Sequence, residues 1–222
     1  MRRSALIALS TLWGIGPAIA ADPPPIPMPP QLAAFLTEQN EQNLVKSQAL
    51  RDWNGAVVDC GAPTLEGANV VIGVPPTFDK AGKPMSGEWR VITSLAGCGQ
   101  SREFNLLYSF APNGQMLRTG MLPGSSAADP ILQRDALTHA STAMSRLTPP
   151  GCQDIRYLDT AFDAFGPPGV GVPAGREARS WTEKWTIWAC GVQGIVKLYF
   201  TPDARGTSIS TRLGEMVKVA PK

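Results

Sequence analysis

Four cysteines are the residues of this chain whose spacing points most directly to chemistry. Cys60 and Cys98 lie 38 residues apart, and Cys152 and Cys190 have the same separation. In an oxidising compartment an even number of cysteines is typical of disulfides. The repeated spacing favours the bridges Cys60–Cys98 and Cys152–Cys190, and the pairing Cys60–Cys152 with Cys98–Cys190 is the alternative. The chain has no Cys-x-x-Cys motif and a single histidine, so the sequence predicts no metal site.

That histidine, His139, could act as a general base only with a positioned nucleophile and an orienting acid. Ser141 and Ser145 are the only such groups near it in sequence, and we interpret His139 as a partly buried helix residue. The cysteines are expected to be oxidised, which argues against a thiol nucleophile. The glycine-rich stretch 165–176 fits no phosphate-binding motif. The sequence therefore predicts no catalytic residue and no cofactor.

Carboxylate pairs could still support hydrolysis, because glycosidases use two acids that flank the scissile bond. The candidates are Glu88, Asp154, Asp159, Asp163 and Glu183. Most acidic residues of an exported domain are simply solvated, and sequence gives no distances between them. A carboxylate-dependent cell-envelope hydrolase is therefore kept as the alternative function.

Tryptophans cluster in the second half of the chain. On a strand, Trp181 and Trp185 would face one side and Trp188 the other. One side must line the core, where aromatic pairs stabilise a sheet. If a solvent-exposed side also carries tryptophan, it would offer a platform for a glycan, a peptide or a partner protein, with Lys184 and Arg179 adding polar contacts. We therefore predict a binding site made of Trp181, Trp185, Lys184 and Arg179.

An internal repeat predicts the elements that position these residues. Sliding the chain against itself by 92 residues superimposes several rare residue types. The aligned pairs are Cys60 with Cys152, Trp89 with Trp181, and Cys98–Gly99 with Cys190–Gly191. We interpret this pattern as a tandem duplication.

Each half is predicted to contain one helix followed by a small antiparallel meander. Apolar spacing predicts a helix over Gln31–Trp53, and Asp129–Pro130 supplies an N-cap and a first-turn proline for a helix that continues to Leu147. The predicted strands are Glu88–Leu95, Glu103–Phe110 and Gln115–Met121, then Trp181–Trp188, Ile195–Thr201 and Thr207–Leu213. Before each set, a short apolar stretch leads into a predicted proline loop, Val70–Val74 into Pro75–Gly87 and Ile155–Phe162 into Gly166–Ser180. The expected fold class is α+β, with a first repeat at 31–124 and a second at 125–222 packed together.

The N-terminus has the pattern of a signal peptide over residues 1–21. Arg2-Arg3 precedes an apolar run from Ala5 to Gly16, which is too short to span a bilayer. Small residues at Ala18 and Ala20 fit a cleavage site. Residues 22–30 are proline-rich and are predicted to form an extended tether. The expected location is periplasmic or secreted, with no membrane span.

Removal of that peptide brings the net charge close to zero. Lys+Arg falls from 20 to 18, against 18 Asp+Glu. A balanced chain gives no reason to expect nucleic acid or an anionic lipid surface as a partner.

The pattern W-x-E-x-W…C-G…F-x-P-D in roughly the last forty residues resembles that of uncharacterised exported proteins of Gram-negative bacteria. The resemblance implies a periplasmic or secreted setting and no activity. The missing catalytic motifs and the clustered aromatics lead to our first functional hypothesis, in which the sheet face around Trp181 and Trp185 and the loop Gly166–Arg179 are the candidate binding surface. We expect a non-catalytic exported module that binds a protein or a cell-envelope polymer.

Overall fold

The computed structural model describes residues 26–57, 60–168 and 179–219 and contains two antiparallel sheets. Sheet 1 has the order β1-β2-β3-β4 and sheet 2 the order β5-β6-β7-β8, with β9 also paired to β7. The strands of sheet 1 are β1 (Thr64–Phe78), β2 (Pro84–Gly97), β3 (Gln100–Phe110) and β4 (Met116–Gly120). Those of sheet 2 are β5 (Ile155–Pro168), β6 (Arg179–Ala189), β7 (Val192–Asp203), β8 (Gly206–Thr211) and β9 (Val217–Val219), with a short 3-10 helix, η1 (Leu213–Glu215), before β9.

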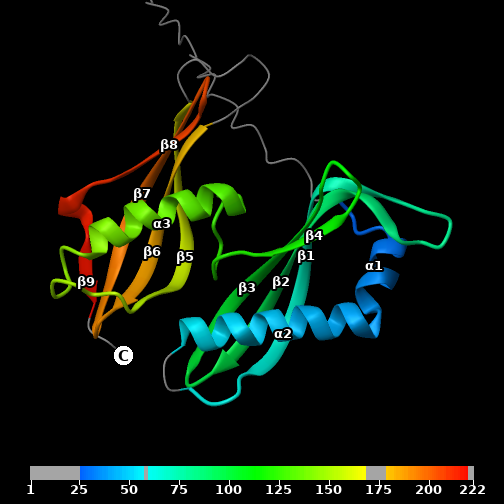
Figure 1. Ribbon diagram of the computed structural model, residues 1–222, viewed down its shortest axis with the longest axis horizontal. Helices are drawn as coiled ribbons and strands as arrows, with labels where there is room; N and C mark the ends of the chain where they lie inside the picture. Colours follow the sequence, from blue (N-terminus) through cyan, green and yellow to red (C-terminus); the bar gives the residue numbers. More distant parts are fainter. Residues whose placement is uncertain (1–25, 58–59, 169–178, 220–222) are drawn as a thin grey trace, which may run out of the picture.

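Each sheet is covered by helix on one face. Figure 1 shows α2 (Gln39–Ala56) lying across sheet 1 and α3 (Pro130–Met144) lying across sheet 2. A shorter helix, α1 (Pro30–Thr37), precedes α2, and the extended backbone of Glu38 separates them. The helix predicted over Gln31–Trp53 is therefore interrupted.

The cores form where apolar helix stripes meet alternate strand residues. Under α1 and α2, Trp89 and Tyr108 stack with ring centroids 5.2 Å apart, and Trp53 meets Phe104 edge-on at 6.1 Å. Under α3, small residues such as Ala140 allow a close approach of the helix to sheet 2.

The predicted α+β fold class, with two repeats of one helix and a small meander, is wrong, because the chain is mostly β. The difference lies in β1 and β5, which were predicted as short apolar stretches leading into proline loops. Together with β2, they are the longest strands of the structure, and each lies at one edge of its sheet. Proline lacks an N–H group, but an edge strand does not need that group on its open side. Pro75–Pro76 and Pro167–Pro168 accordingly lie within these strands, at shifts of register.

Both bridges favoured by the cysteine spacing are present, Cys60–Cys98 and Cys152–Cys190. Each joins the chain before an edge strand to the turn of the following hairpin. In the part of the chain that the structure describes, no helix combines the length and the hydrophobicity needed to cross a membrane.

The segment 121–129, which we call the linker, joins the two sheets. On one side Met121 N–H donates to Asn105 O (3.0 Å) and Gly124 N–H to Glu103 O (2.9 Å), both on β3. On the other side Thr160 N–H of β5 donates to Pro123 O (2.8 Å). The boundary predicted between residues 124 and 125 falls inside the linker, where the backbone bonds to both sheets.

Candidate functional site

The two tryptophans predicted to bind a ligand lie on the side of sheet 2 that α3 covers. Trp185 is 0% exposed, so its ring cannot contact a partner. Trp181 is partly exposed and stacks on Phe200, with ring centroids 4.8 Å apart and planes 4° from parallel. Its Nε1–H donates to Glu183 Oε1 at 2.9 Å. Trp185 is therefore core packing and cannot form part of the predicted aromatic platform, and a binding role for the partly exposed Trp181 stays a prediction.

The opposite side of sheet 2, which we call the open face, carries polar and aromatic side chains. Along the two central strands its residues alternate with those buried under α3. They are Thr182, Lys184, Thr186 and Trp188 on β6 and Tyr199, Lys197, Ile195 and Gln193 opposite them on β7. Lys184 is exposed and the others are partly exposed. Of the four predicted binding residues, Lys184 lies on this face, and Arg179 lies exposed at the start of β6.

Cations lie over aromatic rings at two positions of the open face. Arg156 lies over the Trp188 ring at 5.2 Å, and Arg212 lies over the Tyr199 ring at 4.3 Å. The Tyr199 hydroxyl donates to Glu215, which raises the pKa of Tyr199. These contacts hold the rings in fixed positions and leave part of each accessible to solvent.

Arg179 makes a similar contact away from this face. It lies 5.5 Å from the ring centroid of Phe165, which is 58% exposed at the end of β5. The proline- and glycine-rich loop that precedes Arg179 was considered as a binding loop, and its residues 169–178 lie outside the described residues.

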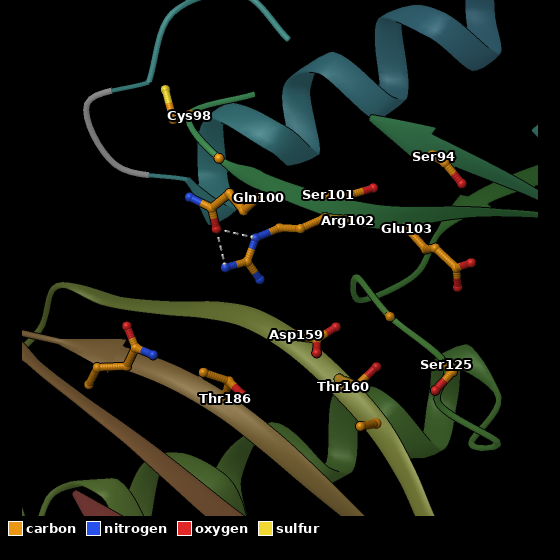
Figure 2. Close-up of a pocket in the computed structure, with 14 residues that line it drawn as sticks. Ser94, Cys98, Gln100, Ser101, Arg102, Glu103, Ser125, Asp159, Thr160 and Thr186 are labelled. Carbon is orange, nitrogen blue, oxygen red and sulfur yellow. Dashed lines mark hydrogen bonds between the residues drawn. The ribbon is translucent and has the colours of Figure 1, made fainter. Parts of the chain in front are cut away.

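A cleft of about 750 Å³ lies between the two sheets at the edge of the open face. Figure 2 shows side chains from β3 and β5 pointing into it from opposite sides. Its lining is mainly polar and includes Gln100, Arg102, Glu103, Asp159, Thr186 and Gln193. Because Thr186 and Gln193 also belong to the open face, the cleft and the face form one continuous surface.

Arg102 spans this cleft. Its Nε and Nη2 donate to Gln100 Oε1 at 3.1 and 2.8 Å (Figure 2). Its Nη1 donates to Leu158 O across the gap. Burial lowers the pKa of Arg102, and the nearby Asp159 carboxylate partly offsets this effect. Arg102 therefore links β3 to β5.

Asp159 and Glu103 are the acidic groups of the cleft. Burial raises the pKa of Asp159, Arg102 lowers it, and the nearby Glu103 charge raises it further. The cleft thus contains a carboxylate with an elevated pKa close to a second carboxylate.

The other acids singled out from the sequence have structural partners or lie elsewhere. Glu183 is 0% exposed and accepts hydrogen bonds from two indoles and one amide. Asp154 pairs with Arg156 at 3.3 Å, and Glu88 lines a separate groove on sheet 1. His139 is exposed on α3, where a partly buried position was predicted.

Asp163, the last of the acids singled out from the sequence, lies on the open face and binds two lysines. Its carboxylate contacts Lys184 Nζ and, at 2.9 Å, Lys197 Nζ, and it accepts a hydrogen bond from Thr182 Oγ1 at 3.0 Å. Lys184 and then Lys197 lower the pKa of Asp163. Sequence reasoning missed Lys197, although the alternation V-K-L-Y-F in β7 is the signal that assigns Lys197 and Tyr199 to one face.

Within the described ranges, no group of three or more His, Cys, Asp and Glu side chains is arranged to hold a metal ion. No protein-family model matches the chain, and neither a curated protein nor a solved structure shows significant similarity to it.

Proposed function

We propose that this protein is a non-catalytic exported module that binds a protein or a cell-envelope polymer through the open face and the adjoining cleft. The observation that carries the proposal is the composition of this surface. One side of a sheet keeps two aromatic rings, two lysines and several hydroxyl and amide groups partly exposed, and it leads into a polar cleft. Binding surfaces commonly combine aromatic rings with such polar groups.

Export is part of the same proposal. Two disulfides are typical of proteins that fold in an oxidising compartment. Residues 1–21, which lie outside the described residues, have the signal-peptide pattern, and residues 22–30 would separate the folded part from the cleavage site. A periplasmic or secreted location gives the open face access to cell-envelope polymers.

The test is co-sedimentation of the mature, disulfide-bonded protein with purified cell-envelope sacculi. Thr186 lies on both the face and the cleft, so Thr186→Arg would block both surfaces. We expect this substitution to weaken binding by at least about tenfold. The matched control is Thr138→Arg on the exposed side of α3, which should bind like the wild type. Equal binding by the T186R variant and the wild type would contradict the proposal.

A carboxylate-dependent hydrolase is the second candidate, because Asp159 and Glu103 share the cleft. An acid with a raised pKa beside a second carboxylate is what general acid catalysis of glycoside hydrolysis requires. The two candidates differ in whether soluble fragments are released from the sacculi. Release that is abolished by Glu103→Gln and by Asp159→Asn would favour the hydrolase, and binding without release favours the module.

A further inference from the structure

Two lysines on the open face are direct cross-strand neighbours. Lys184 of β6 pairs in register with Lys197 of β7, and their side chains lie on the same side of the sheet. Like charges directly opposite each other destabilise an antiparallel pair. An anion between the two ammonium groups offsets this repulsion.

Asp163 supplies that anion from the neighbouring edge strand. It is the extra residue of a β5 bulge, between Phe162, which pairs with Glu183, and Ala164, which pairs with Thr182. Bulges redirect side chains and are frequent beside functional sites. Here the bulge accompanies an Asp163 side chain that reaches both lysines and the Thr182 hydroxyl.

Stability alone gives little reason for this cluster. The side chains of Lys184 and Lys197 are 52% and 27% exposed, and ion pairs at such positions contribute on the order of 0 to 1 kcal/mol. One carboxylate also serves two ammonium groups, so a positive charge is left over. The nearby Arg212 and Glu215 pair with each other and do not remove this excess.

We propose that Lys184 and Lys197 form an anion-binding site for an acidic polymer, and that the Asp163 carboxylate occupies this site until the ligand replaces it. The inference rests on the proposed function and narrows its ligand to a chain that carries carboxylate or phosphate groups. Two flexible ammonium groups can rearrange around either anion. Thr182, which donates to Asp163, would donate to the incoming anion in the same way.

The decisive variant is Asp163→Asn, which keeps the shape of the side chain and removes its charge. If Asp163 competes with the ligand, removing that competition should tighten binding by about tenfold. Calorimetric titration of the mature protein with oligogalacturonate and with polyphosphate measures this change and distinguishes carboxylate from phosphate ligands. Asp135→Asn is the control, because Asp135 is 60% exposed on α3 and the substitution changes the net charge equally. The inference would be overturned if D163N bound both probes no more tightly than the wild type. It would also be overturned if D135N showed the same gain in affinity as D163N.

Substitution of the lysines supplies a second and independent measurement. Lys184→Gln and Lys197→Gln should each weaken binding of the responsive polymer, while Lys46→Gln on the exposed side of α2 should not. Unchanged binding in both variants would overturn the inference even if D163N failed to fold. Binding of neutral dextran that T186R abolishes and D163N leaves unchanged would support the proposed function and exclude this anion site. Tighter polyphosphate binding by D163N without any binding to sacculi would support the anion site and contradict the proposed function.

Discussion

Glu183 is a buried carboxylate that the structure satisfies with N–H groups. Oε1 accepts hydrogen bonds from Trp181 Nε1 and Ala127 N, both at 2.9 Å, and Oε2 accepts one from Trp185 Nε1 at 2.8 Å. A buried anion is tolerated when its lone pairs are filled in this way. Because Ala127 belongs to the linker, Glu183 also holds the linker against sheet 2.

Glu183→Gln should lower the free energy of unfolding by about 2 to 3 kcal/mol. The new amide group can accept two of the three hydrogen bonds, but its NH₂ then faces the third N–H donor. Urea unfolding followed by tryptophan fluorescence measures the loss. Glu38→Gln, at an exposed position, should leave the transition unchanged. A Glu183→Gln midpoint equal to that of the wild type would refute the structural role of this carboxylate.

The three tyrosines give the fold a defined response to alkaline pH. Burial raises the pKa of Tyr108 and Tyr157 above the ordinary 10.0, and the hydrogen bond to Glu215 raises that of Tyr199. The folded protein therefore keeps phenol protons that the unfolded chain releases. The resulting stability is fully present below pH 10 and is lost as the pH rises, at about 1.4 kcal/mol per pH unit for Tyr108. Phenolate absorbance during an alkaline titration should appear together with unfolding. Tyr108→Phe should reduce the slope of the free energy of unfolding against pH. Ionisation of all three tyrosines near pH 10 in the folded protein would contradict this.

For single residues, the sequence predicts which side chains share one side of a strand better than it predicts whether that side is buried. Lys184 was assigned to a binding surface and lies on the open face, but Trp185 was assigned to the same surface and is fully buried. Strand periodicity separates two sides and does not say which one a helix will cover. Asp163 reaches the lysines from the β5 bulge, and a bulge depends on pairing that the sequence does not reveal.

Among the elements, the two Cys-Gly hairpin turns show how a disulfide and a turn type act together. Cys98 and Gly99 have φ of 51° and 73°, and Cys190 and Gly191 have φ of 46° and 83°. Two consecutive residues with positive φ between paired strand ends define a type I′ hairpin. A cysteine is strained in this conformation, by about 1 to 2 kcal/mol.

The turn conformation leads to a prediction for chains without the bridge. Asparagine tolerates positive φ better than serine, so C60S/C98N should be more stable than C60S/C98S by about 1 kcal/mol. Urea unfolding compares the two variants. C60N/C98S is the matched control and should show no gain, since the positive φ belongs to Cys98. Equal stability of all three variants would show that the turn does not constrain residue 98.

Helices and strands could be predicted from the sequence where a cap or a turn motif marks their ends. Asp129 caps α3 through a 2.9 Å hydrogen bond from Leu132 N–H, as the Asp-Pro pair indicated. The hairpin strands around Cys98–Gly99 and Cys190–Gly191 lie close to the predicted ranges. The edge strands β1 and β5 were missed because their prolines indicate loops, and only the position of a strand in its sheet makes a proline acceptable there.

For the whole molecule, the linker sets how the two covered sheets lie relative to each other. Each sheet has its own helix layer and its own disulfide. Hydrogen bonds from the linker to β3 and β5, together with Arg102, connect the two sheets and form the walls of the cleft. The tandem duplication stays a prediction, and the geometry of the cleft depends on the linker rather than on either half alone.

Gly124 is the position at which this connection can be tested. Its φ is +98°, and an added Cβ would lie 2.1 Å from Thr160 O and 2.7 Å from Thr160 N. Gly124→Ala should therefore break the bridge to β5 and leave both sheets folded. We expect hydrogen exchange at the Thr160 and Ser125 amides to accelerate by at least about tenfold, since Thr160 N–H loses Pro123 O and Ser125 N–H loses Thr160 O.

Gly114→Ala separates this clash from simple backbone strain. Gly114 also has a positive φ, +79°, but an added Cβ there would meet no atom within 4 Å. The G114A variant should show strain confined to its own hairpin and normal exchange at Thr160. Small-angle scattering should show a broader distribution of sheet orientations in the G124A variant alone, because its linker no longer holds β5 beside β3. If G124A and G114A exchange equally slowly at Thr160, the linker does not control the cleft, and the two sheets must be held together by Arg102 and the packing of α2 against β5.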